Sequence, residues 1–318
     1  MISDNLFREV LVLPSTRCNQ LKIISGYASP AMANKHLSAL RNNVSISLVV
    51  GMTSQDGMGL GGHNGFKSIC TENALFQCNY VVSKPPVHTK SYIWLKDNEP
   101  IIAYTGSGNY SQNAFFGGTS EAFAEDDPIQ CNKLFTDVMS NSSSCLDPNI
   151  ETLIVFYEEI YRRKSLTKQE ILNSSSDAND VPDNVPTEEC VTLSLLSSRD
   201  GQTHNQSGLN WGQRYGREPN QAYIPIPSQI AKSGFFPNRA NHFTMITDDG
   251  VSLDCAVAQD GDKAIHTTKS NSIMGRYFRK RLGVADGEYV TTDHLRKYGR
   301  TDVRVCKIDN ETYFLDFS

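Results

Sequence analysis

Polar side chains that can handle a phosphate group occur in two close pairs within residues 86–113. His88 lies two residues before Lys90, and Ser107 lies two residues before Asn109. Residues two apart in a β-strand point to the same face of the sheet. An imidazole, an ammonium, a hydroxyl and an amide gathered in this way could attack a phosphoryl group and stabilise its oxygens.

The chain between the two pairs predicts a β-hairpin. Residues 92–95 and 101–104 are apolar and rich in β-branched and aromatic side chains, as strands are. Residues 97–100 read Asp-Asn-Glu-Pro, which is typical of a turn. We expect Lys96 to pair with Ile101 across this four-residue loop.

This register places the two polar pairs opposite each other. Lys90 would face Ser107 and His88 would face Asn109, while a slip of one residue would separate them. An isolated His-x-Lys is more simply a surface feature of a polar hairpin. The Gly-Ser-x-Asn sequence at residues 106–109 favours a catalytic site instead.

The two motifs together resemble a known half-motif. His-x-Lys at residues 88–90 followed by Gly-Ser-x-Asn at residues 106–109 is similar to the pattern of the phospholipase D superfamily. That pattern has an Asp where this chain has Leu95, a departure that argues against the lipases and is tolerated in the nuclease branch. A Glu downstream completes the site in that branch, and the resemblance implies Glu121, with Glu125 as the alternative.

The resemblance and the chemistry of these side chains predict a phosphodiesterase that needs no cofactor. His88 would attack phosphorus and form a phosphohistidine, which splits one displacement into two. Lys90, Asn109 and Ser107 would stabilise the phosphoryl oxygens, and Glu121 would orient a histidine. No cluster of carboxylates of the kind that holds Mg²⁺ is evident in the motif, so we expect metal-independent cleavage.

The motif occurs once in the chain. None of the other histidines is followed two residues later by Lys. One His cannot serve as nucleophile and as leaving-group acid in the same step. We therefore expect a homodimer in which a two-fold axis joins two copies of the half-site.

The last third of the chain carries a second resemblance. Residues 208–318 are similar to the B3-like DNA-recognition domain of type II restriction endonucleases of the NgoFVII/NgoAVII type, to which BfiI-like enzymes are related. The segments that carry it are Tyr223-Ile224-Pro225-Ile226-Pro227, Gly234-Phe235-Phe236-Pro237, Thr247-Asp248-Asp249-Gly250, Lys263-Ala264-Ile265-His266-Thr267 and Tyr298-Gly299-Arg300-Thr301-Asp302.

This second resemblance implies a fold and a set of partners. The fold would be an α/β N-terminal phospholipase D-like nuclease domain with a mixed sheet, followed by a C-terminal all-β B3-like pseudobarrel. The substrate would be double-stranded DNA. A companion DNA methyltransferase is expected, and some relatives need an ATPase or helicase-like partner protein.

B3-like domains grip the major groove with two arms, which the resemblance assigns to residues 199–217 and 269–281. Arg suits guanine edges, Asn and Gln suit adenine edges, and Asp accepts from cytosine. The expected DNA-binding residues are Arg199, Asp200, Gln202, Gln213, Arg214, Lys269, Asn271, Arg276, Arg279 and Arg281. Trp211 and Tyr215 are expected to pack within the domain.

Charge is distributed unevenly along the 318 residues, whose net charge is −5. From residue 186 on, 16 basic residues balance 16 acidic ones. Residues 263–285 contain six basic residues and no acidic one. This stretch is either a phosphate-facing patch or a face whose acidic partners come from elsewhere in the fold.

The pattern of apolar residues divides the chain in two. Strand-like and helical runs alternate up to residue 163, which predicts an α/β domain, and short strand-like runs separated by turns follow residue 190, which predicts a β-barrel. The segment between them is polar, acidic and contains Pro, as linkers do. The expected domains are a nuclease domain at 1–172, a linker at 173–189 and a DNA-binding domain at 190–318.

Three further segments have a predictable local structure. Residues 57–65 contain five glycines and read as a flexible loop, because they lack the Lys-Ser/Thr of a phosphate-binding P-loop. Residues 150–163 read as a helix. Residues 278–282 read as a loop or a short helix between strands.

The eight Cys residues have no Cys-x-x-Cys or other metal-ligand spacing. The N-terminus shows no signal-peptide pattern, and no apolar run is long enough to span a membrane. We therefore expect reduced thiols, no metal site, no membrane contact and a cytoplasmic protein.

Two other functions stay open from the sequence. A lipid phosphodiesterase would share the hairpin, but it would add a membrane-facing amphipathic element and usually a second motif. A non-catalytic DNA-binding protein with a degenerate nuclease domain would explain the missing Asp at Leu95. The intact His88, Lys90 and Asn109 argue against this second alternative.

Overall fold

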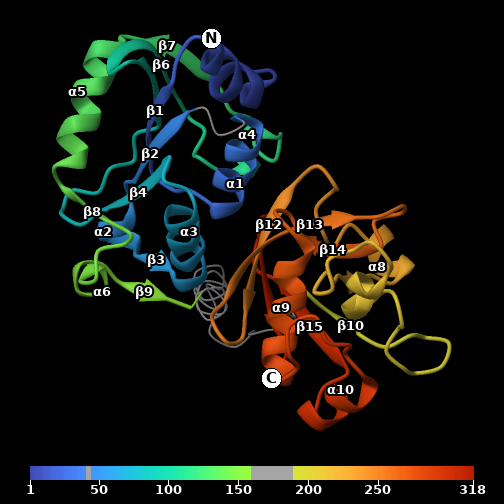
Figure 1. Ribbon diagram of the computed structural model, residues 1–318. Helices are drawn as coiled ribbons and strands as arrows, with labels where there is room; N and C mark the ends of the chain where they lie inside the picture. The colour runs from blue at the N-terminus through green and yellow to red at the C-terminus, as the bar shows by residue number, and fades with distance from the viewer. Residues whose placement is uncertain (41–43, 159–188) are drawn as a thin grey trace, which may run out of the picture. The chain divides into compact units, whose positions relative to one another are not determined.

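A computed structural model describes residues 1–40, 44–158 and 189–318 of the chain. These residues belong to two compact units, Met1–Glu158 and Glu159–Ser318 (Figure 1). The predicted linker at 173–189 lies outside the described residues except for Glu189, so the predicted domain boundaries stay a prediction. Within the described residues, no helix is both long enough and apolar enough to cross a membrane.

The first unit is built on a mixed sheet, as predicted, and the sheet has seven strands. From edge to edge its strands are β7 (Phe123–Asp126), β6 (Glu99–Gly106), β5 (Ser91–Lys96), β1 (Gln20–Ser25), β2 (Ser45–Val50), β4 (Phe76–Val81) and β8 (Ser142–Ser144). Strands β1, β2 and β4 run parallel, and the other pairings are antiparallel. The carboxyl ends of the parallel strands therefore meet at one edge of the sheet.

Helices cover both faces of this sheet (Figure 1). The amphipathic helix α5 (Pro128–Met139) buries Cys131, Phe135 and Val138 against one face. The other face is covered by α1 (Pro30–Leu40) and α3 (Leu60–Glu72). The remaining short elements are η1 (Phe7–Val12), η2 (Leu13–Thr16), α2 (Thr53–Asp56), α4 (Gln112–Phe115), α6 (Ile150–Leu153) and the parallel pair β3 (Met58–Gly59) and β9 (Phe156–Tyr157).

Two of the local expectations in this unit are wrong. Most of the glycine-rich stretch is helical, because α3 begins at Leu60. A Cβ at Gly65 would lie 2.7 Å from Cγ of Pro30, so this glycine lets α1 and α3 approach closely rather than making a loop flexible. The expected helix at 150–163 ends at Leu153 and gives way to β9, and residues 159–163 lie outside the described residues.

Strands β5 and β6 form the predicted hairpin, but with a tighter turn. Lys96 pairs with Glu99, and the turn residues Asp97 and Asn98 have φ of 51° and 72°. Two positive φ angles in a two-residue turn are the requirement of a type I′ hairpin, which Asn and Asp tolerate better than most residues. Past a bulge at Trp94, the register differs by one residue from the one predicted. The N–H of Gly106, and not Ser107, meets the carbonyl oxygen of Lys90 at 3.3 Å, so the predicted pairing of Lys90 with Ser107 across the hairpin is wrong.

The second unit is a seven-stranded sheet that nearly closes on itself. Its strands, in order, are β10 (Cys190–Ser194), β15 (Asp302–Lys307), β16 (Thr312–Asp316), β12 (His242–Thr247), β13 (Ser252–Ala258), β14 (Ala264–Thr267) and β11 (Ile224–Pro225). The terminal strands β10 and β11 lie in contact. Alternating buried residues of these strands form one core, which confirms the predicted all-β pseudobarrel.

Helices accompany this barrel. They are η3 (Gly208–Gln213), α8 (Ser228–Lys232), α9 (Asn271–Leu282) and α10 (Thr292–Tyr298). The expected loop or short helix at 278–282 is the end of the twelve-residue helix α9, which Gly283 terminates with φ of 66°. Met274 and Phe278 of α9 are fully buried in the core.

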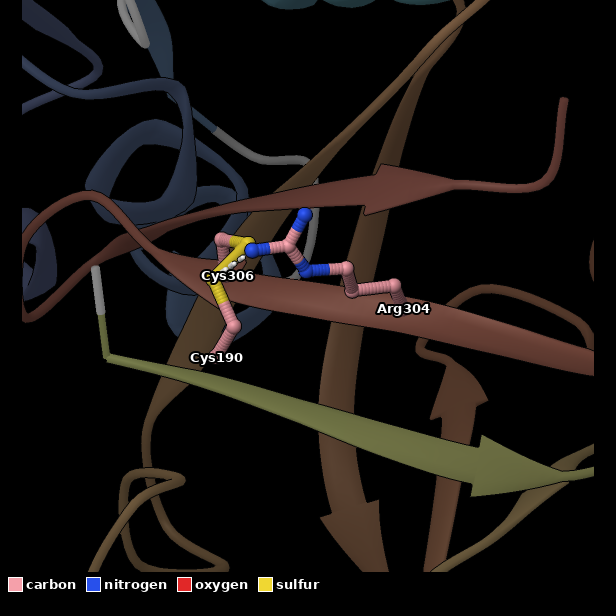
Figure 2. The surroundings of a disulfide bond; sticks show 3 residues. All are labelled: Cys190, Arg304 and Cys306. Atoms are coloured by element: carbon pink, nitrogen blue, oxygen red, sulfur yellow. Dashed lines mark hydrogen bonds between the residues drawn. A yellow bond between two sulfur atoms is a disulfide. The ribbon is translucent and has the colours of Figure 1, made fainter. Parts of the chain in front are cut away.

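A disulfide joins the first strand of the second unit to a strand near its end. Cys190 pairs directly with Cys306 in the β10–β15 ladder, with the Cα atoms 4.0 Å apart (Figure 2). The guanidinium of Arg304 donates to Sγ of Cys190 at 3.5 Å. This pair corrects the expectation that all eight thiols are reduced. The two residues are 116 positions apart, so their spacing in the sequence carried no signal of pairing.

Candidate active site and DNA interface

His88 lies in an extended segment that precedes β5 rather than within the strand. This segment is held by the loop after β2, because the N–H of Val87 donates to the carbonyl oxygen of Gly51 at 3.0 Å. A Cβ at Gly51 would lie 1.9 Å from the carbonyl oxygen of Val87, so only glycine permits this approach. The His88 side chain is exposed, whereas that of Lys90 is buried.

Lys90 points at the imidazole of His88. Its Nζ donates to Nε2 of His88 at 3.0 Å and to the carbonyl oxygen of His88 at 2.8 Å. Burial lowers the pKa of Lys90, and the nearby carboxylate of Glu121 opposes that shift. The site thus places an ammonium group and an imidazole nitrogen side by side, at the point where both could contact one phosphoryl group.

Asn109 and His88 border the same glycine. The Oδ1 of Asn109 accepts from the N–H of Tyr27 at 3.2 Å and lies 3.5 Å from the hydroxyl oxygen of Ser25. A Cβ at Gly26 would lie 2.9 Å from Cδ2 of His88 and 3.4 Å from Oδ1 of Asn109. With its oxygen occupied, Asn109 presents its NH₂ group as the end that can donate to a phosphoryl oxygen.

Ser107 and Glu121 form a second polar pair. The Ser107 hydroxyl donates to the carboxylate of Glu121, which also accepts from Thr119 at 2.8 Å. The pair forms because Ser107 follows β6 and Glu121 precedes the antiparallel neighbour β7. Glu125, the alternative fourth residue, is exposed on β7 opposite Tyr104. The structure therefore places Glu121, and not Glu125, next to the motif.

Some residues at this site were missed from the sequence. Ser25 ends β1, Gly26 and Tyr27 follow it, Gly51 follows β2, and Asp56 lies in α2 shortly after Gly51. The available signal was that polar and glycine residues end two predicted strands, where the carboxyl ends of parallel strands meet. Their link to His88 was hidden by sequence separations of more than 30 residues.

No metal-binding cluster of His, Cys, Asp or Glu occurs among the residues that the structure describes. Two other histidines of the unit, His36 and His63, are buried and bonded to tyrosine hydroxyls, at 2.9 Å to Tyr110 and 3.1 Å to Tyr80. Burial lowers the pKa of each to about 4. Both are therefore neutral core residues.

Five of the expected DNA contacts, besides Arg276 of α9, are exposed in the second unit. Arg199, Asp200 and Gln202 lie in the turn after β10, where the N–H of Gln202 donates to the Asp200 carboxylate at 3.1 Å. Arg214 is exposed after η3, and Lys269 is exposed before α9. These side chains lie on the surface, where they can reach a partner.

Two amides of the expected set have partners within the domain. The Gln213 side chain donates to the carbonyl oxygens of Pro219 and Gly287 at 3.1 and 3.0 Å. The Oδ1 of Asn271 lies 2.9 Å from Nδ1 of His266. Their amide groups hold local structure in the protein alone.

The arginines of α9 differ sharply in exposure, which corrects the expectation for two of them. Arg279 is 1% exposed and donates to four backbone carbonyls, those of Pro219, Asn220, Gly275 and Glu288. Arg281 is largely buried between Asp248 and Asp249, at 2.8 and 3.2 Å. Arg276 is exposed, but it contacts Glu218 at 3.4 Å and Asp286 at 3.3 Å.

For Arg276 and Arg281, the acidic partners of the basic stretch come from outside it, at Glu218 and Asp286 and at Asp248 and Asp249.

Two aromatic residues of the first arm differ from each other. Trp211 packs against Tyr223, and the guanidinium of Arg217 lies 4.0 Å from the centre of the Trp211 ring. Tyr215, expected to pack, is fully exposed. Arg217 and Tyr215 therefore join the exposed surface around Arg214.

The fold and the two sites define a phospholipase D-like nuclease domain followed by a B3-like DNA-binding domain. Residues 4–152 match the family model described as the NgoFVII restriction endonuclease N-terminal PLD domain. Residues 185–309 match the model described as the NgoFVII C-terminal B3-like DNA-binding domain. The chain belongs to this family of restriction endonucleases, which confirms the family predicted from the motifs.

Among solved structures, the chain is similar to NucT from Helicobacter pylori. The two are 15% identical over 45% of this chain and 96% of NucT, with a TM-score of 0.33. A polyphosphate kinase from Porphyromonas gingivalis is 8% identical over 44% of this chain and 21% of the kinase, with a TM-score of 0.29. The search of curated proteins gave no match.

Proposed function

We propose that this protein is a type II restriction endonuclease that hydrolyses DNA phosphodiester bonds at or near a specific sequence, with His88 as its nucleophile. One observation carries the proposal. His88 and Asn109 border Gly26 directly after β1, and Lys90 contacts His88. Glu121 accepts a hydrogen bond from Ser107, and its carboxylate acts on the pKa of Lys90. The family to which both parts of the chain belong joins such a site to a DNA-binding domain.

In the first step, Nε2 of His88 would attack phosphorus. A P–N bond forms, the P–O bond to the leaving deoxyribose oxygen breaks, and water later cleaves the phosphohistidine. In the free protein Lys90 donates to this nitrogen. A phosphoryl oxygen is a charged acceptor and forms a stronger hydrogen bond with an ammonium group. Bound DNA would therefore draw Lys90 away and free the lone pair of His88.

Glu121 would keep the site in its working protonation state. Its carboxylate opposes the effect of burial on the pKa of Lys90 and accepts a hydrogen bond from the Ser107 hydroxyl. Lys90 must be protonated to stabilise charge on the phosphoryl oxygens in the transition state. The NH₂ of Asn109 would donate to the same oxygens, and Ser107 would do so only by giving up its hydrogen bond to Glu121.

The leaving oxygen needs a proton that the attacking His88 cannot supply. With one His-x-Lys in the chain, we propose that two copies pair across a two-fold axis and that the two His88 side chains take opposite roles. The composite site would contain two imidazoles and two ammonium groups. These protein cations would replace metal ions, so cleavage would be metal-independent.

Sequence readout is assigned to the exposed arm residues of the second unit. We retain Arg199, Asp200, Gln202, Arg214, Lys269 and Arg276 as DNA contacts and leave out the buried Arg279 and Arg281. Gln213 and Asn271 would contact DNA only after giving up their present partners. A companion methyltransferase and an ATPase partner stay predictions, and adding ATP to the cleavage assay tests the second.

The deciding experiment is digestion of plasmid DNA by the purified protein with EDTA present, followed by mapping of the ends. Discrete fragments under these conditions are expected. A strict need for Mg²⁺ would overturn the phosphohistidine mechanism. Hydrolysis of phosphatidylcholine without DNA cleavage would favour a lipid phosphodiesterase, and specific binding without cleavage would favour a non-catalytic DNA-binding protein.

A further inference from the structure

The imidazole of His88 packs against one exposed aromatic ring. Tyr27, in the loop after β1, has its ring centre 6.1 Å from that of His88, with the planes at 77°. Edge-to-face packing of this kind is a preferred geometry for aromatic pairs and restrains both ring planes. Tyr27 is 46% exposed, so it does not serve the core of the unit.

Tyr27 is held in place from three sides. Its N–H donates to Oδ1 of Asn109 at 3.2 Å, and its carbonyl oxygen accepts from the hydroxyl of Ser25 at 2.6 Å. Its hydroxyl donates to Oδ2 of Asp56 at 2.5 Å. The last contact anchors the free end of the side chain to the short helix α2, and a hydrogen bond to a carboxylate is stronger than one to a neutral acceptor.

The close approach of this loop to His88 depends on Gly26. A Cβ there would lie 2.9 Å from Cδ2 of His88 and 3.4 Å from Cγ of Met52. The absence of a side chain lets Tyr27 reach the imidazole while its backbone still contacts Asn109. One short loop therefore connects the nucleophile, the oxyanion-binding amide and Asp56.

His88 needs such a support. A histidine that acts as a nucleophile is normally oriented by a further group, often a carboxylate. Within the described residues of a single chain, the polar side chain that contacts the ring nitrogens of His88 is Lys90. A carboxylate that orients His88 would have to come from the second copy in the proposed dimer. Lys90 has to move to the phosphoryl group during the reaction, so it cannot hold the imidazole at that moment.

We propose that Tyr27, anchored by Asp56, is the positioning residue that sets the orientation of the His88 imidazole. The inference rests on the proposed function, because it takes His88 as the nucleophile. Asp56 acts on His88 indirectly, because it holds the Tyr27 hydroxyl. Neither Asp56 nor Tyr27 exchanges a proton with the substrate. The pair aligns Nε2 for attack once DNA has drawn Lys90 away.

The test uses the full-length protein and four variants, Tyr27→Ala, Tyr27→Phe, Asp56→Asn and the double variant Tyr27→Phe/Asp56→Asn. Asp137→Asn on the exposed side of α5 is the matched control, because its carboxylate is remote in sequence from the site and on a different element. Single-turnover cleavage at saturating DNA and equilibrium DNA binding are measured separately. Thermal unfolding shows that each variant is folded.

Tyr27→Ala is expected to slow single-turnover cleavage by about tenfold while DNA affinity stays unchanged, as loss of an aromatic contact and of the geometry it maintains predicts. Tyr27→Phe keeps the ring and should recover part of that loss. Asp56→Asn replaces a charged acceptor by a neutral one, so it should lose no more rate than Tyr27→Phe. The double variant should be no slower than Tyr27→Phe, because both changes act on one hydrogen bond.

Other outcomes overturn the inference. A Tyr27→Ala enzyme with the wild-type rate would show that His88 is oriented without it. A loss confined to DNA affinity would make Tyr27 a DNA contact instead of a positioning residue. Additive losses in the double variant would separate Asp56 from Tyr27. Each variant is compared with a wild-type protein that cleaves DNA. Failure of the proposed function would appear differently, as a wild-type protein that does not cleave DNA or a His88→Ala variant that does.

Discussion

The two units differ in how well residue spacing in the sequence predicts where the functional side chains lie. In the first, residues of a spaced motif end up around one point, with His88, Lys90 and Asn109 together at the ends of strands. In the second, a run of basic residues is dispersed, so that Arg276 lies on the surface and Arg279 in the interior. Spacing within a motif predicted position, whereas local charge did not.

The difference has a physical cause. A pair of residues two apart next to a strand keeps its relative geometry wherever the strand is packed. A charged helix meets neighbours from the whole domain, and any guanidinium on its inner face must find acceptors there. Arg279 donates hydrogen bonds to four backbone carbonyls, and Arg281 forms ion pairs with Asp248 and Asp249. The comparison therefore predicts opposite consequences for matched substitutions in the two units.

The largest effect is expected at the motif. His88→Ala should reduce cleavage by about 10⁴-fold or more, because the nucleophile is lost, while specific DNA binding by the second unit stays intact. Plasmid cleavage and a gel-shift titration measure the two properties. Lys96→Ala, at the exposed far end of the same hairpin, is the control and should cleave normally. Cleavage by His88→Ala at the wild-type rate would contradict the assignment of catalysis to the motif of the first unit.

The arginines of α9 test the second unit. Arg279→Leu leaves buried carbonyls without a donor and should lower the free energy of unfolding by about 3–5 kcal/mol in a urea titration. Arg276→Leu removes an exposed ion pair, so its cost should stay below about 1 kcal/mol. Its effect should appear as weaker DNA binding. Equal losses of stability in the two variants would contradict the assignment of Arg279 to the interior.

The disulfide should make the second unit alone sensitive to reductant. Reduction of Cys190–Cys306, which closes a long loop, should lower the stability of this unit by about 2–4 kcal/mol. The described cysteines of the first unit are free, so its unfolding transition should not move. Urea unfolding with and without dithiothreitol gives the shift. Cys190→Ser should have the urea midpoint of the reduced protein whether or not dithiothreitol is present. If dithiothreitol left the midpoint of the oxidised wild-type protein unchanged, the disulfide would be refuted.

Acid should act on the first unit through its buried histidines. Burial lowers the pKa of His36 to about 4, from a usual value of 6.5. The unfolded chain therefore binds more protons between these values, and stability is lost as pH falls from about 6.5 to about 4. Between pH 7 and 5 the loss should be about 2 kcal/mol for His36. His36→Gln should show a flatter dependence in urea titrations, and an unchanged slope would argue against a neutral His36.

Parts of the fold and site could be predicted because they depend on neighbours in the chain. The hairpin, the alternation of strands and helices, and the all-β second unit follow from local apolar patterns. The predicted register of the hairpin differs from that observed for two reasons. The turn has two residues, Asp97 and Asn98, instead of four, which shifts the pairing by two, and the bulge at Trp94 then reduces the difference to one. The glycines at 57–65 were read as a loop, although close packing of two helices explains Gly65.

The sequence by itself determined the reactive groups, the family and the general fold of each unit. Tertiary structure alone decided what surrounds those groups: the Tyr27 and Gly51 loops beside His88, the acidic partners of Arg281, and the pairing of Cys190 with Cys306. The physical reason is distance along the chain. Motif residues are neighbours in sequence, whereas these contacts join segments that only packing of strands and helices brings together.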